Sequence, residues 1–151
     1  MICSVIGHRD VQESDELKIQ VKAVFKQLIT RGVDTFLIGS RGSFNGFSLK
    51  CLRELRQEYP GMVKIVYVRA EYEYIDEDYR QYLLQVYDDT YMPECVKKAK
   101  KAVYIVRNKF MIDNSEICVF YCNRNKREKS GTLASYSYAE KKNKQIINIY
   151  Q

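Results

Sequence analysis

Short apolar runs alternate along the chain with longer segments in which apolar residues recur every three or four positions. The first run, Ile2 to Gly7, ends in glycine, and Ser14 to Arg31 follows it with apolar residues at helical spacing. Continuous short runs are typical of buried strands, whereas the longer period predicts an amphipathic helix. The chain therefore begins with a predicted strand and a predicted helix.

The same alternation continues through the first half of the chain. Gly32 suits the end of the first helix, Thr35 to Ile38 is a second apolar run, and the next helix should end near Tyr59-Pro60-Gly61. Val63 to Val68 is a third run, rich in β-branched residues. Apolar strands alternating with helices predict a parallel sheet that helices cover on both faces.

The stretch from Tyr72 to Tyr91 interrupts this rhythm. Six tyrosines alternate there with acidic residues and leave no clean period. We expect an irregular or partly helical excursion that packs on the domain as an acidic, solvated flap. Tyrosine also suits wet boundaries, so covering the mouth of a ligand site or forming a subunit contact are the alternatives.

Four more elements follow the tyrosine-rich stretch. We predict a helix over Val103 to Asn114, a strand over Ile117 to Tyr121, a helix over Thr132 to Asn143 and a strand over Gln145 to Tyr150. The predicted fold class for residues 1–151 is one α/β domain, Rossmann-like and doubly wound, with a mainly parallel sheet of about five strands. Right-handed crossovers give the strand order 3-2-1-4-5, with the crevice between strands one and four.

Composition supports a folded globular chain. The 151 residues are 46% hydrophobic and 29% charged, with only two prolines and seven glycines, which excludes disorder. The first residues lack the features of a signal peptide, and no apolar stretch approaches the roughly 20 residues that span a bilayer. We expect a cytoplasmic protein with no membrane partner.

The five cysteines predict reduced thiols rather than disulfides or a metal site. Their number is odd, and Cys118 and Cys122 are four residues apart in a chain with a single histidine. A zinc site would lack enough ligands. We therefore expect no metal and no cofactor.

The net charge of +6 is unevenly distributed. Residues 71–94 contain eight acidic residues against Arg80 alone, so the remainder of the chain carries about +13. Such a dipolar molecule draws an anion toward its basic part.

Three loops follow predicted strands at the edge where doubly wound sheets bind ligands. They are Gly7-His8-Arg9, Gly39-Ser40-Arg41-Gly42-Ser43, and Cys122 to Thr132, in which Ser130-Gly131-Thr132 opens a helix. Glycine lets a ligand approach the backbone, a helix start offers free amides, and arginine offers a two-pronged donor. Each loop alone is equally an ordinary turn or cap, but their joint placement predicts an anion site.

Two further side chains are ambiguous. His8 is suited to act as a general acid, as a hydrogen-bond donor, or only as a packed polar group. Arg107 lies among Val103, Ile105 and Val106, where arginine either pairs within the domain or holds a phosphate at the crevice.

Four segments resemble the SLOG superfamily: IGHRD, IGSRGSFNGFSLKCLREL, VRNKFMIDNSEICVFY and SGTLASYSYAEKKNKQIINIY. They span nearly the whole chain, and the group they most resemble is one of small stand-alone bacterial and phage proteins. The resemblance implies a Rossmann-like fold that binds nucleotides or nucleotide-derived signals. The superfamily includes Lonely Guy phosphoribohydrolases, DNA-processing proteins and sensors in bacterial defence.

The Lonely Guy motifs are only half present. Their first block, Glu-Arg-Lys-x-x-Met, is matched by Arg107 and Met111, with Val106 in place of its glutamate. Their second, Gly-Gly-x-Gly-Thr-x-x-Glu, is matched by Gly131-Thr132, but Ser135 replaces the final glutamate. Cleavage of an N-glycoside passes through an oxocarbenium-like state that a carboxylate stabilises. The resemblance therefore favours binding over hydrolysis.

The predicted function is the sensing or sequestering of a nucleotide-derived, phosphate-containing small molecule, by a monomer or a homodimer. The residues expected to contact it are Gly7, His8, Arg9, Gly39, Ser40, Arg41, Gly42, Arg107, Asn108, Met111, Ser130, Gly131 and Thr132.

Two alternative functions use other residues. A nucleotide N-glycoside hydrolase would need a carboxylate from Asp10, Asp113 or Glu116. DNA or RNA binding would use two basic clusters: Lys97, Lys98, Lys100, Lys101, Arg124, Lys126, Arg127 and Lys129.

Overall fold

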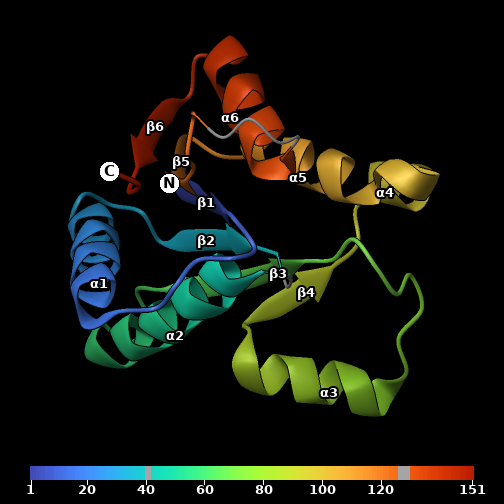
Figure 1. Ribbon diagram of the computed structural model, residues 1–151. Helices are drawn as coiled ribbons and strands as arrows, with labels where there is room; N and C mark the ends of the chain where they lie inside the picture. Colours follow the sequence, from blue (N-terminus) through green and yellow to red (C-terminus); the bar gives the residue numbers. More distant parts are fainter. Residues whose placement is uncertain (40–41, 126–129) are drawn as a thin grey trace.

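The computed structural model describes residues 1–39, 42–125 and 130–151, and its centre is a fully parallel sheet (Figure 1). The strands are β1 (Ile2–Gly7), β2 (Thr35–Ile38), β3 (Lys64–Val68), β4 (Asp89–Tyr91), β5 (Ile117–Tyr121) and β6 (Gln145–Asn148). Their order is β4-β3-β2-β1-β5-β6. The Rossmann-like α/β class is confirmed, and the predicted order of five strands recurs with β4 added beside β3.

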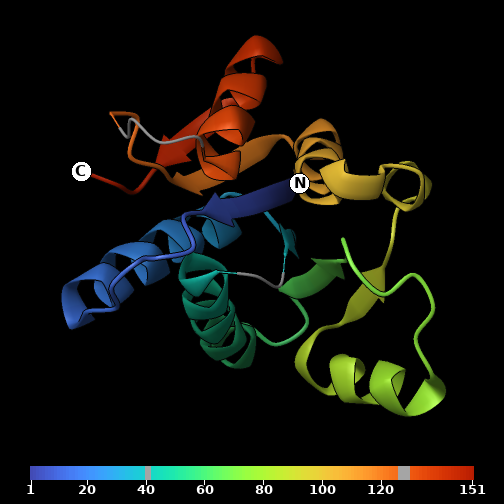
Figure 2. The ribbon, with the colours of Figure 1, turned by 45° about the vertical axis from the view of Figure 1, so that its right-hand side comes forward.

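Helices cover both faces of this sheet (Figures 1 and 2). On one face lie α1 (Asp15–Thr30), α2 (Ser43–Glu58) and α3 (Glu77–Val86); on the other lie α5 (Val103–Asp113) and α6 (Gly131–Lys141), preceded by the short helix α4 (Glu94–Lys97) and the 3₁₀ turn η1 (Lys100–Ala102). Each face has its own hydrophobic core, as a sheet buried on both sides requires.

The strands divide their side chains between the two cores. In β1, Cys3 and Val5 pack toward α1 and α2, whereas Ile6 packs toward α5 and α6. This alternation follows from the two-residue period of a strand. The one polar side chain inside β1, Ser4, is buried and hydrogen-bonded to the hydroxyl of Ser115.

The tyrosine-rich stretch is more ordered than its sequence indicates. Asp76 caps α3 by accepting a hydrogen bond from the backbone N–H of Tyr79, and β4 then adds an edge to the sheet. Only Leu83 of α3 is buried, so the helix lacks the apolar stripe from which it would have been recognised. β4 has three residues and is too short to show a pattern.

All five cysteines are free thiols, and four of them are buried. Burial raises the pKa of Cys51 to about 11 and that of Cys118 to about 12, because a thiolate is poorly solvated there. Across the described residues, the helices are too short or too polar to cross a bilayer.

Candidate functional site

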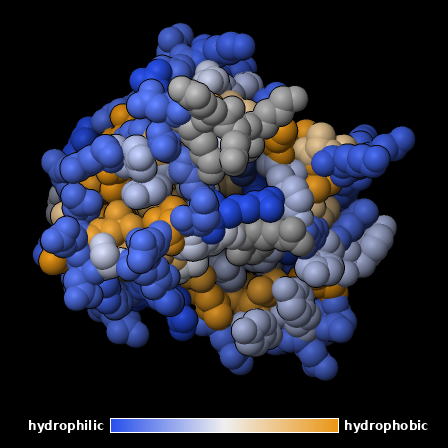
Figure 3. All heavy atoms as spheres, viewed as in Figure 1, coloured by the Kyte–Doolittle hydropathy of each residue, from blue (hydrophilic) through white to orange (hydrophobic). Residues whose placement is uncertain are grey.

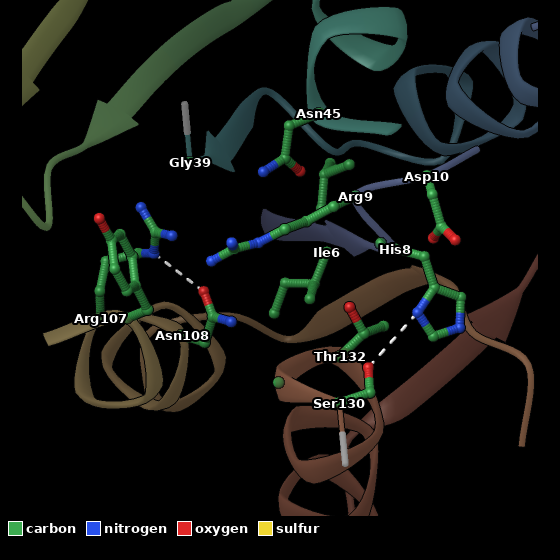
Figure 4. A pocket seen from close by; sticks show the side chains of 14 residues that line it. Ile6, His8, Arg9, Asp10, Gly39, Asn45, Arg107, Asn108, Ser130 and Thr132 are labelled. Atoms are coloured by element: carbon green, nitrogen blue, oxygen red, sulfur yellow. Dashed lines mark hydrogen bonds between the residues drawn. The ribbon is translucent and has the colours of Figure 1, made fainter. Parts of the chain in front are cut away.

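A cavity of about 410 Å³ opens at the carboxyl ends of β1 and β2, and we call it the β1–β2 cavity (Figure 4). It lies beside the point where the strand order reverses, since β2 flanks β1 on one side and β5 on the other. Open α/β sheets bind ligands at such points. Its lining residues are Val5, Ile6, Gly7, His8, Arg9, Asp10, Gly39, Asn45, Tyr104, Arg107, Asn108, Ser130, Gly131 and Thr132.

Arg107 is the most deeply buried charged side chain of this cavity, with 4% of its surface exposed. Its Nη1 donates to the carbonyl of Val68 at 3.1 Å, and its Nε donates to Oδ1 of Asn108 at 2.9 Å. Burial lowers the pKa of Arg107 to about 10 because the charged guanidinium is poorly solvated. No ion pair joins it to a carboxylate of the described residues.

A second arginine shares an aromatic neighbour with Arg107. The guanidinium carbon of Arg107 is 5.8 Å from the centre of the Tyr104 ring, and that of Arg9 is 5.6 Å from the same centre. Figure 4 shows the Arg9 side chain extending across the cavity toward Arg107 and Asn108. The charge of Arg9 further lowers the pKa of Arg107. Two cations over one ring produce a positive potential that attracts an anion.

Gly39 leaves the space that the Arg107 guanidinium occupies. A Cβ atom at position 39 would lie 2.7 Å from Cζ and Nη1 of Arg107. That distance is too short for any real contact, so the arginine would have to move. The absence of a side chain at Gly39, after β2, therefore allows the Arg107 side chain of α5 to occupy its observed position.

The amino terminus of α6 forms the opposite wall. Ser130 caps the helix by accepting a hydrogen bond from the backbone N–H of Leu133, and Gly131 and Thr132 also line the cavity. A Cβ at Gly131 would have no atom within 4 Å. The first backbone amides of a helix lack partners within it and favour anions.

His8 connects three parts of this wall. Its Nε2 accepts a hydrogen bond of 2.8 Å from the backbone N–H of Asn123, and its Nδ1 lies 3.4 Å from Oγ of Ser130. A ring nitrogen that accepts a backbone hydrogen bond carries no proton. The structure therefore places His8 as a link between β1, the loop after β5 and α6.

Asn108 ties Arg107 to α6. Its Nδ2 donates to Oγ of Ser135 at 3.1 Å, and Ser135 donates in turn to the carbonyl of Gly131. Ser135 is buried and is not among the lining residues. Ser135 thus supports the orientation of Asn108.

Most residues predicted from sequence meet in this cavity. They are Gly7, His8, Arg9, Gly39, Arg107, Asn108, Ser130, Gly131 and Thr132. Met111 is a correction, because its side chain is buried in the core between the sheet and α5, one helical turn away from the cavity. Gly42 caps α2 at a positive φ of 98° beside Arg9 without lining the cavity. Ser40 and Arg41 lie outside the described residues.

Five lining residues were not foreseen as ligand contacts: Val5, Ile6, Asp10, Asn45 and Tyr104. Tyr104 precedes Arg107 by three positions, a spacing that places both on one helix face and would have indicated the contact. Asn45 reaches the cavity from the first turn of α2. Asp10 lines it too, whereas Asp113 accepts from the Tyr138 hydroxyl and Glu116 from the backbone of Ile2.

Comparison with protein families identifies one match over almost the whole chain. The model for YpsA, described as "YspA SLOG family", matches residues 6–151. The chain belongs to this SLOG family. A comparison with curated proteins finds no match.

Solved structures with the same fold come from two kinds of protein. DNA processing protein A of Streptococcus pneumoniae has a TM-score of 0.64 and 12% identity, over 95% of this chain and 48% of its own length. The molybdenum cofactor binding protein of Rippkaea orientalis has a TM-score of 0.60 and 13% identity, over 97% and 74%. The molybdenum cofactor carrier protein MCP of Chlamydomonas reinhardtii has a TM-score of 0.59 and 17% identity, over 96% of this chain and 73% of its own length.

The match with DNA processing protein A of Helicobacter pylori, described by its single-stranded DNA binding, has a TM-score of 0.60 and 15% identity, over 97% of this chain and 63% of that protein. The chain thus spans about half of the S. pneumoniae protein and less than two thirds of the H. pylori one. At these identities the likeness shows the fold.

Proposed function

We propose that this SLOG protein binds a nucleotide-derived, phosphate-containing small molecule in the β1–β2 cavity. The observation that carries the proposal is Arg107, a buried guanidinium that faces the cavity and forms no ion pair with a carboxylate of the described residues. Removing a charge from water costs several kcal/mol unless a partner compensates it. A phosphate group offers that compensation through paired charged hydrogen bonds.

The other residues that line the cavity support the same class of ligand. Arg9 adds a second positive charge, and the α6 amides favour an anionic group on the opposite side. Tyr104 offers an aromatic face, and Asn45 offers an amide. Two fold neighbours are described as binding or carrying the molybdenum cofactor, which agrees with a small molecule as the ligand of this fold.

Calorimetric titration with AMP, ADP-ribose, NAD and adenosine tests the proposal. The phosphate-containing compounds should bind to the wild type and lose most of their affinity in Arg107→Ala, whereas adenosine should bind weakly or not at all. Lys50→Ala is a matched control, since Lys50 is exposed on α2 and lies outside the cavity. Unchanged affinity in Arg107→Ala would refute the assignment.

A nucleic acid is the competing ligand for the same positive potential. Binding of single-stranded oligonucleotides that survives about 0.2 M salt, with no binding of mononucleotides, would replace the proposal by a nucleic-acid function. Lys126, Arg127 and Lys129 of the predicted basic clusters lie outside the described residues, whereas Arg124 forms an ion pair with Glu140.

Hydrolysis of an N-glycoside is a second candidate, and Asp10 is the observation that favours it. It is the one of the three proposed carboxylates that lines the cavity. A carboxylate there would stabilise the developing positive charge of a sugar ring or activate water. Release of free base from nucleoside 5′-monophosphates, abolished by Asp10→Asn while binding persists, would establish this activity.

A further inference from the structure

A second hollow, of about 280 Å³, lies at the far edge of the sheet beside α3. Its lining residues are Tyr72, Tyr74, Ile75, Asp76 and Tyr79, and we call it the tyrosine hollow. None of these residues lines the β1–β2 cavity. In Figure 3, pale side chains of intermediate hydropathy gather over α3 and the loop before it.

The rings of this hollow face solvent to an unusual extent. Tyr74 is 89% exposed, Tyr72 is 64% exposed and Tyr79 is 38% exposed. Tyrosine buries a large apolar area when it packs. A group of exposed rings therefore leaves apolar surface that a binding partner can remove from water.

Two of the three rings contact each other, and the backbone of one of them is fixed. Tyr72 and Tyr79 meet edge to face with ring centres 6.3 Å apart. Tyr72 adopts a positive φ of 60°, and the buried Arg69 donates a hydrogen bond of 2.6 Å from Nη1 to its carbonyl. A side chain in this backbone region persists only where its surroundings hold it. Such preorganisation lowers the entropy lost on binding.

The charge around the hollow selects a cation. Asp76 contributes a carboxylate, and one of its oxygens accepts from the backbone N–H of Tyr79. Residues 71–94 contain eight acidic residues and one basic residue, Arg80, although Asp88 pairs with Arg56 and Glu94 pairs with Lys97. Aromatic faces attract ammonium and guanidinium groups through their quadrupoles, and nearby carboxylates add to this attraction.

Arg80 follows Tyr79 directly, and the buried Arg69 donates to the Tyr72 carbonyl; a third cation, Lys97, is paired outside the hollow. Lys97 interacts electrostatically with Glu73 and Tyr74, but its ammonium forms an ion pair with Glu94 at 2.8 Å. The hydrogen bond to Glu94 raises the pKa of Lys97.

We propose that the tyrosine hollow takes an arginine or lysine side chain from a basic segment of a partner protein. One cation fills the hollow, but the carboxylates of Glu73, Glu77 and Asp78 adjoin its lining residues in the chain and are exposed. A segment that carries several positive charges complements this wider field, whereas a single small cation does not.

The test uses a short arginine-serine peptide and a citrulline-serine peptide of the same length, each titrated into the full chain. Citrulline keeps the shape of arginine and removes its charge. NMR signals of the tyrosine rings should shift saturably with the arginine peptide, and affinity should fall about tenfold with the citrulline peptide. Equal affinity for both peptides would overturn the proposal.

Two variants locate the site. Tyr74→Leu should weaken the arginine peptide about tenfold without affecting the fold, because Tyr74 is the most exposed ring. Tyr150→Leu is the matched control, since it removes a partly exposed ring near the carboxyl terminus. Unchanged binding in Tyr74→Leu would overturn the assignment.

Two other outcomes would replace the proposed occupant. Tetramethylammonium binding as tightly as the arginine peptide would make the hollow a site for a small cation. Self-association of the wild type that Tyr74→Leu abolishes would identify the occupant as a second copy of this chain. Either result would overturn the proposal that the occupant is a basic segment of a different protein.

Discussion

Arg107 and Gly39 show how single residues shape the β1–β2 cavity. The arginine side chain is buried and held by one carbonyl and one amide oxygen, and the glycine leaves room for its guanidinium. Hydrogen bonds from the protein fix the direction of the guanidinium without neutralising its charge. The charge of Glu71 stabilises the guanidinium in part, and under the proposed function the ligand would supply further negative charge. Substitutions at both positions test this.

Replacing Arg107 by lysine keeps the charge and removes the planar pair of donors. We expect binding of a phosphate-containing nucleotide to weaken by about 1–3 kcal/mol, the range for hydrogen bonds that involve charged groups. Calorimetry measures the affinity, and melting temperatures of the free variants report any structural cost. A large drop in melting temperature without a change in affinity would mean that Arg107 is only structural.

Gly39→Ala should act through Arg107. The added methyl would occupy the position of the guanidinium, so affinity should fall nearly as far as in Arg107→Ala. Gly46→Ala is a matched control, because a Cβ there meets no atom within 4 Å. Gly46 lies within α2, so its replacement should raise stability by about 0.5–1 kcal/mol. Equal affinities of the two alanine variants would contradict the proposed role of Gly39.

At this scale, the order of the chain was enough to predict where residues lie, whereas their contact with a ligand stays a prediction. Glycines and arginines directly after apolar runs had to meet at one edge of a parallel sheet, which located Arg9 and Gly39. Met111 was misplaced, because its match to a motif does not show whether the side chain faces the cavity or the hydrophobic core. Asn45 was missed because nothing in the sequence distinguishes it from a residue that caps a helix.

Among the elements, α6 combines two roles. Its later turns pack against the sheet through Tyr136 and Ala139, while its first residues form a wall of the cavity. Ser130 and Gly131 were expected in the site from the sequence, since serine before glycine at a helix start both caps and exposes the amides.

Gly131→Val should separate these roles. A side chain at this position meets no protein atom within 4 Å of its Cβ and would project beside the amides that line the cavity. We therefore expect a large loss of nucleotide affinity with little change in melting temperature. The two measurements together decide, and unchanged affinity would remove the α6 terminus from the site.

The elements α3 and β4 mark the limit of periodicity as a guide. The strands near the centre of the sheet are buried on both sides and read as apolar runs, but the edge strand β4 has only three residues, of which Thr90 alone is buried. Tyr67 and Tyr87, which pack with ring centres 5.0 Å apart, secure this region instead. Tyrosines that pack and tyrosines that face solvent look identical in a sequence.

For the molecule as a whole, buried acids that must stay protonated link stability to pH. Burial raises the pKa of Tyr87 to about 12 from its ordinary value of 10.0, because the phenolate is poorly solvated. The stabilisation from the neutral phenol is complete below pH 10 and is lost as pH rises toward 12. The buried thiols change stability in the same direction.

Tyr87→Phe should therefore flatten the alkaline loss of stability. The wild type should lose about 2 kcal/mol more unfolding free energy than this variant between pH 9 and 12, because most of a shift of two pKa units is expressed by pH 12. Urea unfolding across this range measures it. Tyr150→Phe, at a partly exposed ring, serves as the control and should follow the wild type.

The central position of β1 has a consequence for synthesis on the ribosome. β1 pairs with β2 soon after both have been made, but its other edge waits for β5, where Cys3 aligns with Ile117. Until then an apolar strand edge stays open on the nascent chain, and such edges recruit other chains. A chaperone that shields β1 during this delay should raise the yield of folded protein more than one that acts after release.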